Sequence, residues 1–209
     1  MIRPDGFRGA AFGTTVEGDA RSHADSRRTM ARALGISEDW ATVTQIHGVG
    51  IVEATFAGNL GEADAILTHT RGLPAAVATA DCVPVVIEAN DVVAVIHVGW
   101  RGALAGVVEQ TLDALSASAT PPIRAAIGPA IGPCCYEVGT DVADRFPDDV
   151  SSTTWGTTSV DLAGFVAGRL EGLEIWRSRR CTYTARDLFS YRRDQTDDRQ
   201  VAVGWLPNG

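Results

Sequence analysis

The chain has 209 residues, of which 45% are hydrophobic and 21% are charged, an ordinary composition for a folded globular protein. No window holds the roughly 18 consecutive apolar residues of a membrane span, and the first twenty residues lack the apolar core of a signal peptide, so we expect a cytoplasmic protein. The net charge of -8 argues against a broad basic face for nucleic acid, and the absence of lysine among 18 basic residues excludes a Schiff-base lysine or a Walker-type phosphate loop.

The first part of the chain predicts one helix followed by strands. Residues 25–34 carry a helical pattern, and Gly35 is expected to end that helix. Residues 41–48 and 50–54 predict a short pair of strands, and residues 63–69 predict a further strand.

A long apolar stretch over residues 75–89 is interrupted by Asp81 and Pro84. Because proline cannot donate to the hydrogen-bond ladder of a sheet, we expect a bulge or a break there. Residues 92–99 are predicted to pair with this stretch through a turn at residues 90–91.

The periodicity of the sequence changes from Ala103 onward, where apolar residues recur at helical spacing up to Leu115. Further along, two segments predict strands and two predict helices; the strands are 123–128 and 200–206, and the helices are 140–146 and 161–173. Hairpins mixed with helices favour an α/β (α+β) fold with mixed β-sheets covered by helices, in a single domain over residues 1–209.

Three residues suited to metal binding, His47, Cys82 and His97, each stand near the end of an expected strand, beside glycine or proline. Two imidazoles and one thiolate would give Zn²⁺ three ligands and leave its fourth tetrahedral position open, as in catalytic zinc sites. Gaps of 35 and 15 residues match no short ligand motif. The alternative interpretation is therefore a buried core histidine at position 97 and a space-filling cysteine at position 82.

A Gly-Trp-Arg-Gly turn at residues 99–102 precedes the predicted helix. The N–H groups of residues 102–104 would point out of the helix N-terminus, and with Arg101 beside them they would form a site for an anion such as phosphate. It is equally consistent with the sequence that Arg101 pairs with a carboxylate while Trp100 packs.

Two Gly-Pro pairs in residues 127–139 predict a tight loop that contains Cys134 and Cys135. Adjacent cysteines suit neither a zinc ribbon nor an easy disulfide. They could pack as free thiols, or they could line a pocket with Tyr136, whose ring could stack on a base.

The segment 181–199 contains Arg192 and Arg193, which could contact a ligand, but the local sequence favours a solvated charged loop. His23 and His69 are interpreted as surface or structural residues.

Six motifs in this order resemble the bacterial laccase-domain family, over roughly residues 40 to 206. They are QIHG, ADAILT, ADCVPVVI, HVGWRG, GPAIGPCCYEVG and CT…FSYRRD. Members of that family have been described as polyphenol oxidases, as peptidoglycan-editing factors and as purine nucleoside phosphorylases with adenosine deaminase activity. The resemblance implies layered mixed β-sheets flanked by helices, a monomer, and a zinc ion held by the residues that here are His47, Cys82 and His97.

On this resemblance we expect a zinc-dependent enzyme that acts on purine nucleosides. Phosphate held by Arg101 would attack the ribose of adenosine- or inosine-type substrates, and water activated by the metal would deaminate adenosine. Tyr136 would contact the substrate, while Cys82 and His97 would stand at the reacting groups. Asp81, next to Cys82, would move a proton or orient its neighbour, unless it only caps a backbone turn. The partners are small molecules, with no nucleic acid and no membrane.

Other chemistries fit the same residues. The fold of the family is similar to that of deamidating bacterial toxins, so Cys82 could be a nucleophile with His97 as its base, or the zinc site could hydrolyse an amide, in an amidase that acts on a peptidoglycan precursor. A copper polyphenol oxidase is less favoured, because four histidines in the whole chain cannot supply several copper sites. A metal-binding protein without catalysis is the remaining hypothesis.

Two segments depart from the family pattern. Residues 13–28 are shorter than the usual Thr-Thr-Arg and glycine-rich stretch, and Val16 stands where an arginine is expected. Near the end of the chain, residues 196–199 read Thr-Asp-Asp-Arg in place of Thr-Gly-Arg. We expect the N-terminal change to alter a substrate contact and to leave the metal ligands untouched.

Overall fold

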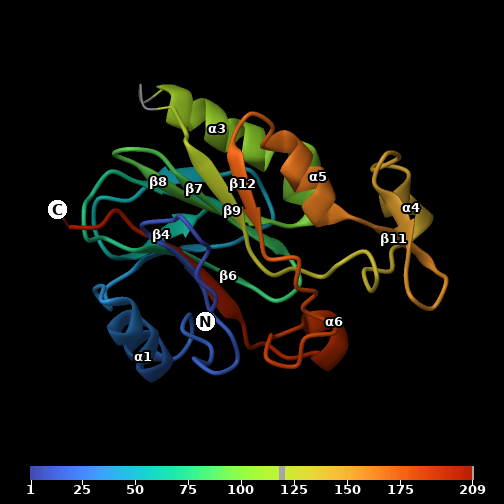
Figure 1. Ribbon diagram of the computed structural model, residues 1–209, viewed down its shortest axis with the longest axis horizontal. Coiled ribbons are helices and arrows are strands. Elements are labelled where there is room, and N and C mark those ends of the chain that lie inside the picture. The colour runs from blue at the N-terminus through green and yellow to red at the C-terminus, as the bar shows by residue number, and fades with distance from the viewer. Residues whose placement is uncertain (118–120, 209) are drawn as a thin grey trace.

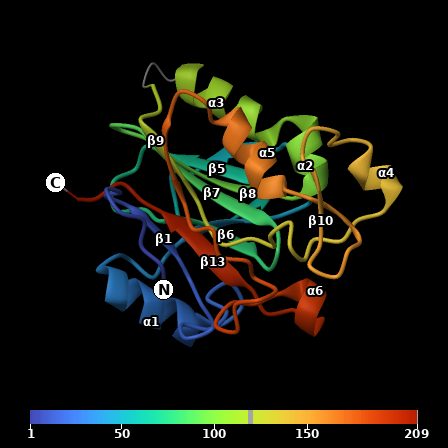
Figure 2. The same cartoon turned by 45° about the vertical axis from the view of Figure 1, so that its right-hand side comes forward.

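Two mixed β-sheets lie face to face in the computed structural model, which describes residues 1–117 and 121–208. The first sheet has the strand order β1-β13-β6-β2-β4. Its strands are β1 (Ala10–Phe12), β13 (Gln200–Gly204), β6 (Ala75–Thr79), β2 (Ala41–Thr44) and β4 (Gly58–Glu62). β13 is antiparallel to both β1 and β6, so the end of the chain is built into the sheet beside its beginning (Figure 2).

The second sheet has the strand order β12-β9-β7-β8-β5-β3. Its strands are β12 (Glu174–Arg177), β9 (Arg124–Ile127), β7 (Val83–Glu88), β8 (Val93–Val98), β5 (Ala65–Thr68) and β3 (Ile51–Glu53). The two outermost pairs are parallel and the pairs between them are antiparallel.

The faces of the two sheets that meet form one apolar layer. Phe12 and Val77 from the first sheet share this cluster with Val86 and Val95 from the second. Gly204 allows the sheets to approach closely, because a Cβ atom there would lie 2.7 Å from Cγ2 of Val95. The residues of β7 and β8 that alternate with these point the other way, toward helices, so both faces of the central strands are buried.

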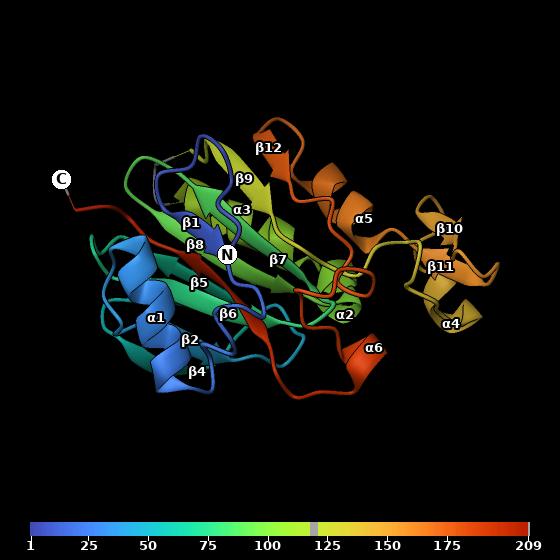
Figure 3. The ribbon, with the colours of Figure 1, turned by 60° about the horizontal axis from the view of Figure 1, so that its bottom comes forward.

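Helices cover the outer faces of both sheets (Figure 1). α1 (Ala24–Leu34) packs Met30 on the first sheet, while α3 (Val107–Ala117) and α5 (Leu162–Arg169) pack Leu115 and Val166 on the second. Three shorter helices are α2 (Trp100–Ala105), α4 (Thr140–Ala143) and α6 (Tyr191–Asp194). The hairpin of β10 (Val150–Ser152) and β11 (Thr158–Val160) stands with α4 to one side of the sheets (Figure 3).

The predicted fold class is confirmed, and so are the helix that ends at Gly35 and the hairpin of β7 and β8. The strand predictions over 63–69, 123–128 and 200–206 are also confirmed. Of the two downstream helices, 161–173 appears as α5 and 140–146 as the shorter α4. The single-domain span 1–209 includes residues 118–120 and 209, which lie outside the described part of the chain.

The predicted pairing of 41–48 with 50–54 is wrong. β2 belongs to the first sheet and β3 to the second, because residues 45–50 carry the chain from one sheet to the other. The break predicted near Asp81 makes the same crossing between β6 and β7, and Asp81 adopts a positive φ of 92° there. Pro84 is not at this break but inside β7, opposite His97. The two crossings lie close together, and each carries one of the candidate ligands, His47 on the first and Cys82 on the second.

The helix predicted from Ala103 begins earlier, at Trp100, and is divided at Gly106, whose φ is 86°. β1, β4, β10, β11, β12 and α6 were not predicted. Within residues 1–117 and 121–208, no helix is long and apolar enough to cross a bilayer.

Candidate metal centre and substrate cavity

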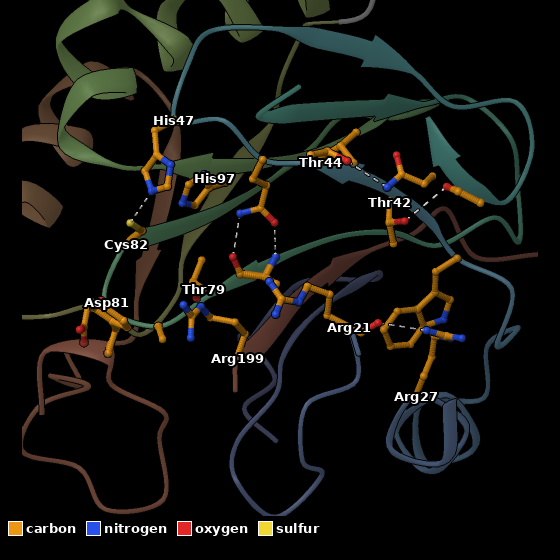
Figure 4. A pocket seen from close by; sticks show the side chains of 18 of the residues that line it. Arg21, Arg27, Thr42, Thr44, His47, Thr79, Asp81, Cys82, His97 and Arg199 are labelled. Carbon is orange, nitrogen blue, oxygen red and sulfur yellow. Dashed lines mark hydrogen bonds between the residues drawn. The ribbon is translucent and has the colours of Figure 1, made fainter. Parts of the chain in front are cut away.

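His47, Cys82 and His97 come together although they lie on three separate segments. His47 stands on the crossing between β2 and β3, Cys82 on the crossing between β6 and β7, and His97 near the end of β8. Their ligand atoms all lie within 4.8 Å of one another, and Sγ of Cys82 is 3.9 Å from Nε2 of His47. The two imidazole rings meet edge to face with centroids 4.8 Å apart (Figure 4).

Asp64 holds these residues in place through hydrogen bonds, and the sequence analysis did not identify this role of Asp64. It is fully buried just before β5, and its Oδ1 accepts hydrogen bonds from Nδ1 of His97 at 2.7 Å and from the backbone N–H of His47 at 3.0 Å. Its Oδ2 accepts from the backbone N–H of Gly48 at 2.7 Å. Since Nδ1 of His97 is engaged, Nε2 is left to face Cys82 and a metal ion.

The two glycines of the Gly-Trp-Arg-Gly turn allow the loop of His47 to approach. A Cβ atom at Gly99 would lie 2.7 Å from Cδ2 of His47, and one at Gly102 would lie 2.8 Å from the carbonyl oxygen of Gly48. His47 itself has φ of 60°, a region that non-glycine residues rarely adopt. The contacts to Asp64 stabilise this conformation, so the position of His47 depends on both segments.

Charge is stabilised on two of the three candidate ligands when no metal is bound. Burial favours the neutral form of His97, but its hydrogen bonds to Asp64 and Cys82 outweigh burial and raise the pKa of His97 to about 9. Burial likewise opposes a Cys82 thiolate, but contacts with His47 and His97 outweigh it and lower the pKa of that thiol to about 6. A thiolate beside an imidazolium is the resulting state at neutral pH.

A cavity of about 1060 Å³ opens beside these residues. His47, Cys82, His97 and Asp81 lie toward one side of it, Arg27 and Thr42 lie toward the other, and Thr79 and Arg199 stand between (Figure 4). The floor includes Gln45, whose amide exchanges two hydrogen bonds with the backbone of Ala78. The cavity is therefore large enough for a nucleoside-sized molecule in contact with the candidate metal ligands.

Four arginines and three carboxylates, those of Glu38, Asp39 and Asp81, line this cavity. Arg27, Arg192 and Arg199 line it and donate to backbone carbonyls, and none of them forms an ion pair with a carboxylate among the described residues. Arg21 also lines it, 3.8 Å from Asp19. Unpaired guanidinium groups around a cavity favour an anionic ligand.

Tyr136 lines the cavity, whereas Cys134 and Cys135 are not among its lining residues. Burial, reinforced by the negative charge of Cys82, raises the pKa of Tyr136 to about 12, so its hydroxyl stays protonated. The guanidinium of Arg192 lies 5.6 Å from the centroid of its ring.

Arg101, the predicted phosphate ligand, is not among the residues that line the cavity. Its side chain is exposed and lies 4.4 Å from the ring centroid of Trp100. Of the N–H groups of residues 102–104, that of Ala103 is not free for a ligand, because α2 begins at Trp100 and the N–H of Ala103 donates to the carbonyl of Gly99 at 2.9 Å.

The carboxylate of Asp81 is occupied by two hydrogen bonds. It accepts from Oγ1 of Thr182 at 2.6 Å and from the backbone N–H of Arg192 at 2.7 Å. These contacts attach the segment around α6 to the crossing that carries Cys82. The geometry therefore favours a positioning role for Asp81, with the proton-transfer role left as a prediction.

Arg193 is not part of a solvated loop, contrary to the interpretation favoured by the sequence. Its side chain is only 12% exposed, and its guanidinium donates to the backbone carbonyls of Thr182, Tyr183, Ala185 and Leu188. Arg192, its neighbour, is the one that reaches the cavity.

The N-terminal segment that departs from the family pattern reaches the cavity through Arg21 and Arg27. Val16, in contrast, is 80% exposed and is not among the lining residues. The segment thus supplies positive charge from other positions.

A family model, related sequences and solved structures give consistent matches to this chain. Residues 3–207 match the family described as multi-copper polyphenol oxidoreductase laccase. A purine nucleoside phosphorylase of Corynebacterium glutamicum is 38% identical over 94% of this chain and 86% of that protein, and one of Deinococcus radiodurans is 38% identical over 89% and 78%. The crystal structure of YlmD from Geobacillus stearothermophilus has a TM-score of 0.85 and 27% identity, covering 99% of this chain and 97% of that one.

Proposed function

The chain belongs to the family described as multi-copper polyphenol oxidoreductase laccase, and from this premise we propose that it is a zinc-binding purine nucleoside phosphorylase that also deaminates adenosine. The names of its relatives in Corynebacterium and Deinococcus support the phosphorylase activity. The observation that carries the proposal is the single cavity that combines a two-histidine, one-cysteine donor set with unpaired arginines.

The donor set fits zinc. Two imidazoles and one thiolate with an open fourth position match a catalytic Zn²⁺ site, and the buried carboxylate of Asp64 orients one imidazole as such sites require. Zn²⁺ bound by His47, Cys82 and His97 would supply Lewis-acid activation of water or of a substrate oxygen.

Copper fits the same residues less well. A blue-copper site uses two histidines and a cysteine, with a weak axial methionine or glutamine. Met1 and Met30, the two methionines of the chain, pack on the outer side of the first sheet, and the amide of Gln45 exchanges two hydrogen bonds with the backbone of Ala78. Neither methionine is therefore placed to be an axial ligand.

The arginines would bind phosphate. Arg199, between the candidate metal ligands and Arg27, donates to the carbonyls of Thr196 and Asp198 through one nitrogen and has two other N–H-bearing nitrogens for a ligand. A phosphate held there would be positioned to attack the ribose, a reaction that depends mainly on orientation and charge stabilisation.

The base would bind against Tyr136, with Arg192 on the other side of the ring. Asp81 would keep Arg192 in place through its backbone N–H. In the deamination reaction the same residues would hold adenosine with its amino-bearing carbon toward His47, Cys82 and His97.

A Cys-His amidase is the second candidate, and the charge state of the site favours it. Without metal, Cys82 is a thiolate beside the imidazolium of His97, the state from which thiol hydrolases react. An amide of a peptidoglycan precursor would then be the substrate.

The decisive experiment supplies the purified, zinc-loaded protein with inosine and with adenosine, in the presence and absence of phosphate. We expect free base and ribose 1-phosphate to form only with phosphate, and inosine to form from adenosine without it. Chromatography separates these products. Turnover of neither nucleoside, together with release of ammonia from a peptidoglycan-precursor amide by the metal-free protein, would reject the proposal and favour the amidase.

A further inference from the structure

A second group of thiols lies outside the site described above. Cys134 and Cys135 follow the Gly-Pro turn between β9 and α4, and Cys181 follows β12; their sulfur atoms all lie within 4.8 Å of one another. Sγ of Cys134 is 3.2 Å from Sγ of Cys135, and all three cysteines are free. We propose that these three residues form a second metal site, for a soft cation that prefers thiolate ligands, namely Cu(I) or Zn²⁺.

The backbone around Gly132 presets the positions of the three sulfur atoms. The carbonyl of Gly132 accepts from the backbone N–H groups of Cys135 and Tyr136, each at 2.9 Å, which closes a tight turn. Its own N–H donates to Sγ of Cys181 at 3.2 Å. Because one residue fixes both segments, a metal ion would find its ligands assembled, and little chain entropy would be lost on binding.

Guanidinium groups beside the thiols would offset the charge of a metal ion bound by three sulfurs. A cavity of about 410 Å³ reaches Cys134 and Cys181, and Arg177, Arg179 and Arg180 line it. Three thiolates around Zn²⁺ or Cu(I) keep a net negative charge, which these guanidinium groups would offset. The carboxylate of Asp161, also in this cavity, accepts the N–H of Gly164, so sulfur supplies the ligands. Three sulfurs match a trigonal Cu(I) site, or a Zn²⁺ site completed by water.

A disulfide between Cys134 and Cys135 is the competing use of these atoms. Their Cα atoms are separated by one trans peptide, about 3.8 Å, whereas disulfides usually span about 4.4–6.8 Å between Cα atoms. That geometry, and the third sulfur beside the pair, favour metal binding over a redox pair.

A metal ion here would connect the loop that places Tyr136 in the wall of the substrate cavity to the loop that holds Asp81 in place. Cys135 precedes Tyr136, which lines that cavity, and Cys181 precedes Thr182, which donates to Asp81. The site would thus stabilise the cavity without contacting the substrate.

The test uses the full chain carrying His47→Ala, which removes a ligand from the first site. Under reducing, anaerobic conditions we expect this variant to bind one equivalent of Co²⁺, with a thiolate-to-metal charge-transfer band, and one equivalent of Cu(I) in competition with a chromogenic chelator. Adding Cys181→Ser should weaken metal binding by at least about tenfold and reduce the band by about a third, since one of three thiolates is lost. Adding Cys82→Ser instead should change neither, which identifies the thiols responsible.

A second measurement needs no substitution at the cluster. In the unmodified protein, iodoacetamide labelling of Cys134 and Cys181, read from their peptides by mass spectrometry, should slow when Zn²⁺ or Cu(I) is added after chelation. The proposal is overturned if labelling is indifferent to metal, if His47→Ala binds none, or if mild oxidation closes a Cys134–Cys135 bond in protein that takes up no metal.

Discussion

Nδ1 of His97 lies 2.7 Å from Oδ1 of Asp64, and both side chains are at most 3% exposed. The same carboxylate accepts the backbone N–H groups of His47 and Gly48. One buried charge therefore fixes the ring orientation of one candidate ligand and the loop position of another. Hydrogen bonds from these partners, with His97 first, outweigh burial and keep the pKa of Asp64 below its usual value.

Replacing Asp64 tests this relationship. Asp64→Asn keeps the size of the side chain but removes the charge that stabilises His97, so we expect zinc affinity to fall about 10- to 100-fold, as for other partners of metal-bound histidines. Asp64→Ala also leaves His97 and the backbone N–H groups of Ile46, His47 and Gly48 without this acceptor, and should destabilise the protein by about 3–5 kcal/mol. Zinc competition titrations and chemical unfolding measure the two effects.

Asp25→Asn is the matched control, because Asp25 is an exposed residue of α1 that pairs only with Arg28. It should alter neither zinc affinity nor, beyond a few tenths of a kcal/mol, stability. Equal effects of Asp25→Asn and Asp64→Asn would show that Asp64 acts through general charge and not through its contacts.

The sequence indicated the candidate ligands better than the contacts that hold them in place. His47, Cys82 and His97 were recognisable because each interrupts or ends an apolar strand beside glycine or proline. Asp64 is a single carboxylate between two alanines, directly before a buried strand. Because burying such a charge is costly, its position in the sequence was a signal that could have identified it.

What the sequence could not reveal were relationships between distant segments. β2 and β3 look like a hairpin because the chain reverses near Gly48, but their partners lie in different sheets. Arg193 looks solvated because its neighbours are charged, whereas four carbonyls from residues 182–188 surround it. The cavity arginines likewise come from both ends of the chain, and no local pattern joins them.

The glycine that faces His47 gives a steric test. Gly99→Ala would place a methyl group 2.7 Å from Cδ2 of His47, so the imidazole or the turn has to move. We expect zinc content to drop and stability to fall by about 1–3 kcal/mol, as for other overpacked sites. Zinc per chain after dialysis and the unfolding midpoint report on this.

Gly168→Ala is the corresponding control. Gly168 lies in α5 with no atom within 4 Å of an added Cβ. Alanine there should raise helix stability by about 0.5–1 kcal/mol and leave zinc content unchanged. A loss of zinc in this variant would show that metal content follows global stability and not the space beside Gly99.

Substitutions of two arginines test which of them binds phosphate. The sequence assigned phosphate to Arg101, whereas Arg199 faces the cavity. Arg199→Ala should raise the KM for phosphate about 10- to 100-fold, because a charge-assisted hydrogen bond contributes roughly 1.5–3 kcal/mol, and it should affect deamination much less. Arg101→Ala should leave both reactions near the original rates. Initial rates measured at varied phosphate concentration give these KM values. A raised KM in Arg101→Ala and an unchanged KM in Arg199→Ala would identify Arg101 as the phosphate ligand.

The sulfur of Cys82 distinguishes the zinc enzyme from the thiol enzyme, although Cys82→Ala is expected to be inactive in either case. As a zinc ligand the thiolate is shielded, so iodoacetamide should label Cys82 slowly in the loaded protein and much faster after chelation. In the chelated protein its pKa of about 6 keeps the thiolate present at neutral pH; labelling should therefore rise through about pH 6 and then level off, below the range of an ordinary thiol. We expect about one zinc in the first site of the purified protein, little retained there in His47→Ala, and activity that is lost on chelation and regained with zinc. A thiol mechanism requires only Cys82 and His97. Full activity in His47→Ala, together with indifference to chelators, would therefore replace the zinc ion with a cysteine nucleophile.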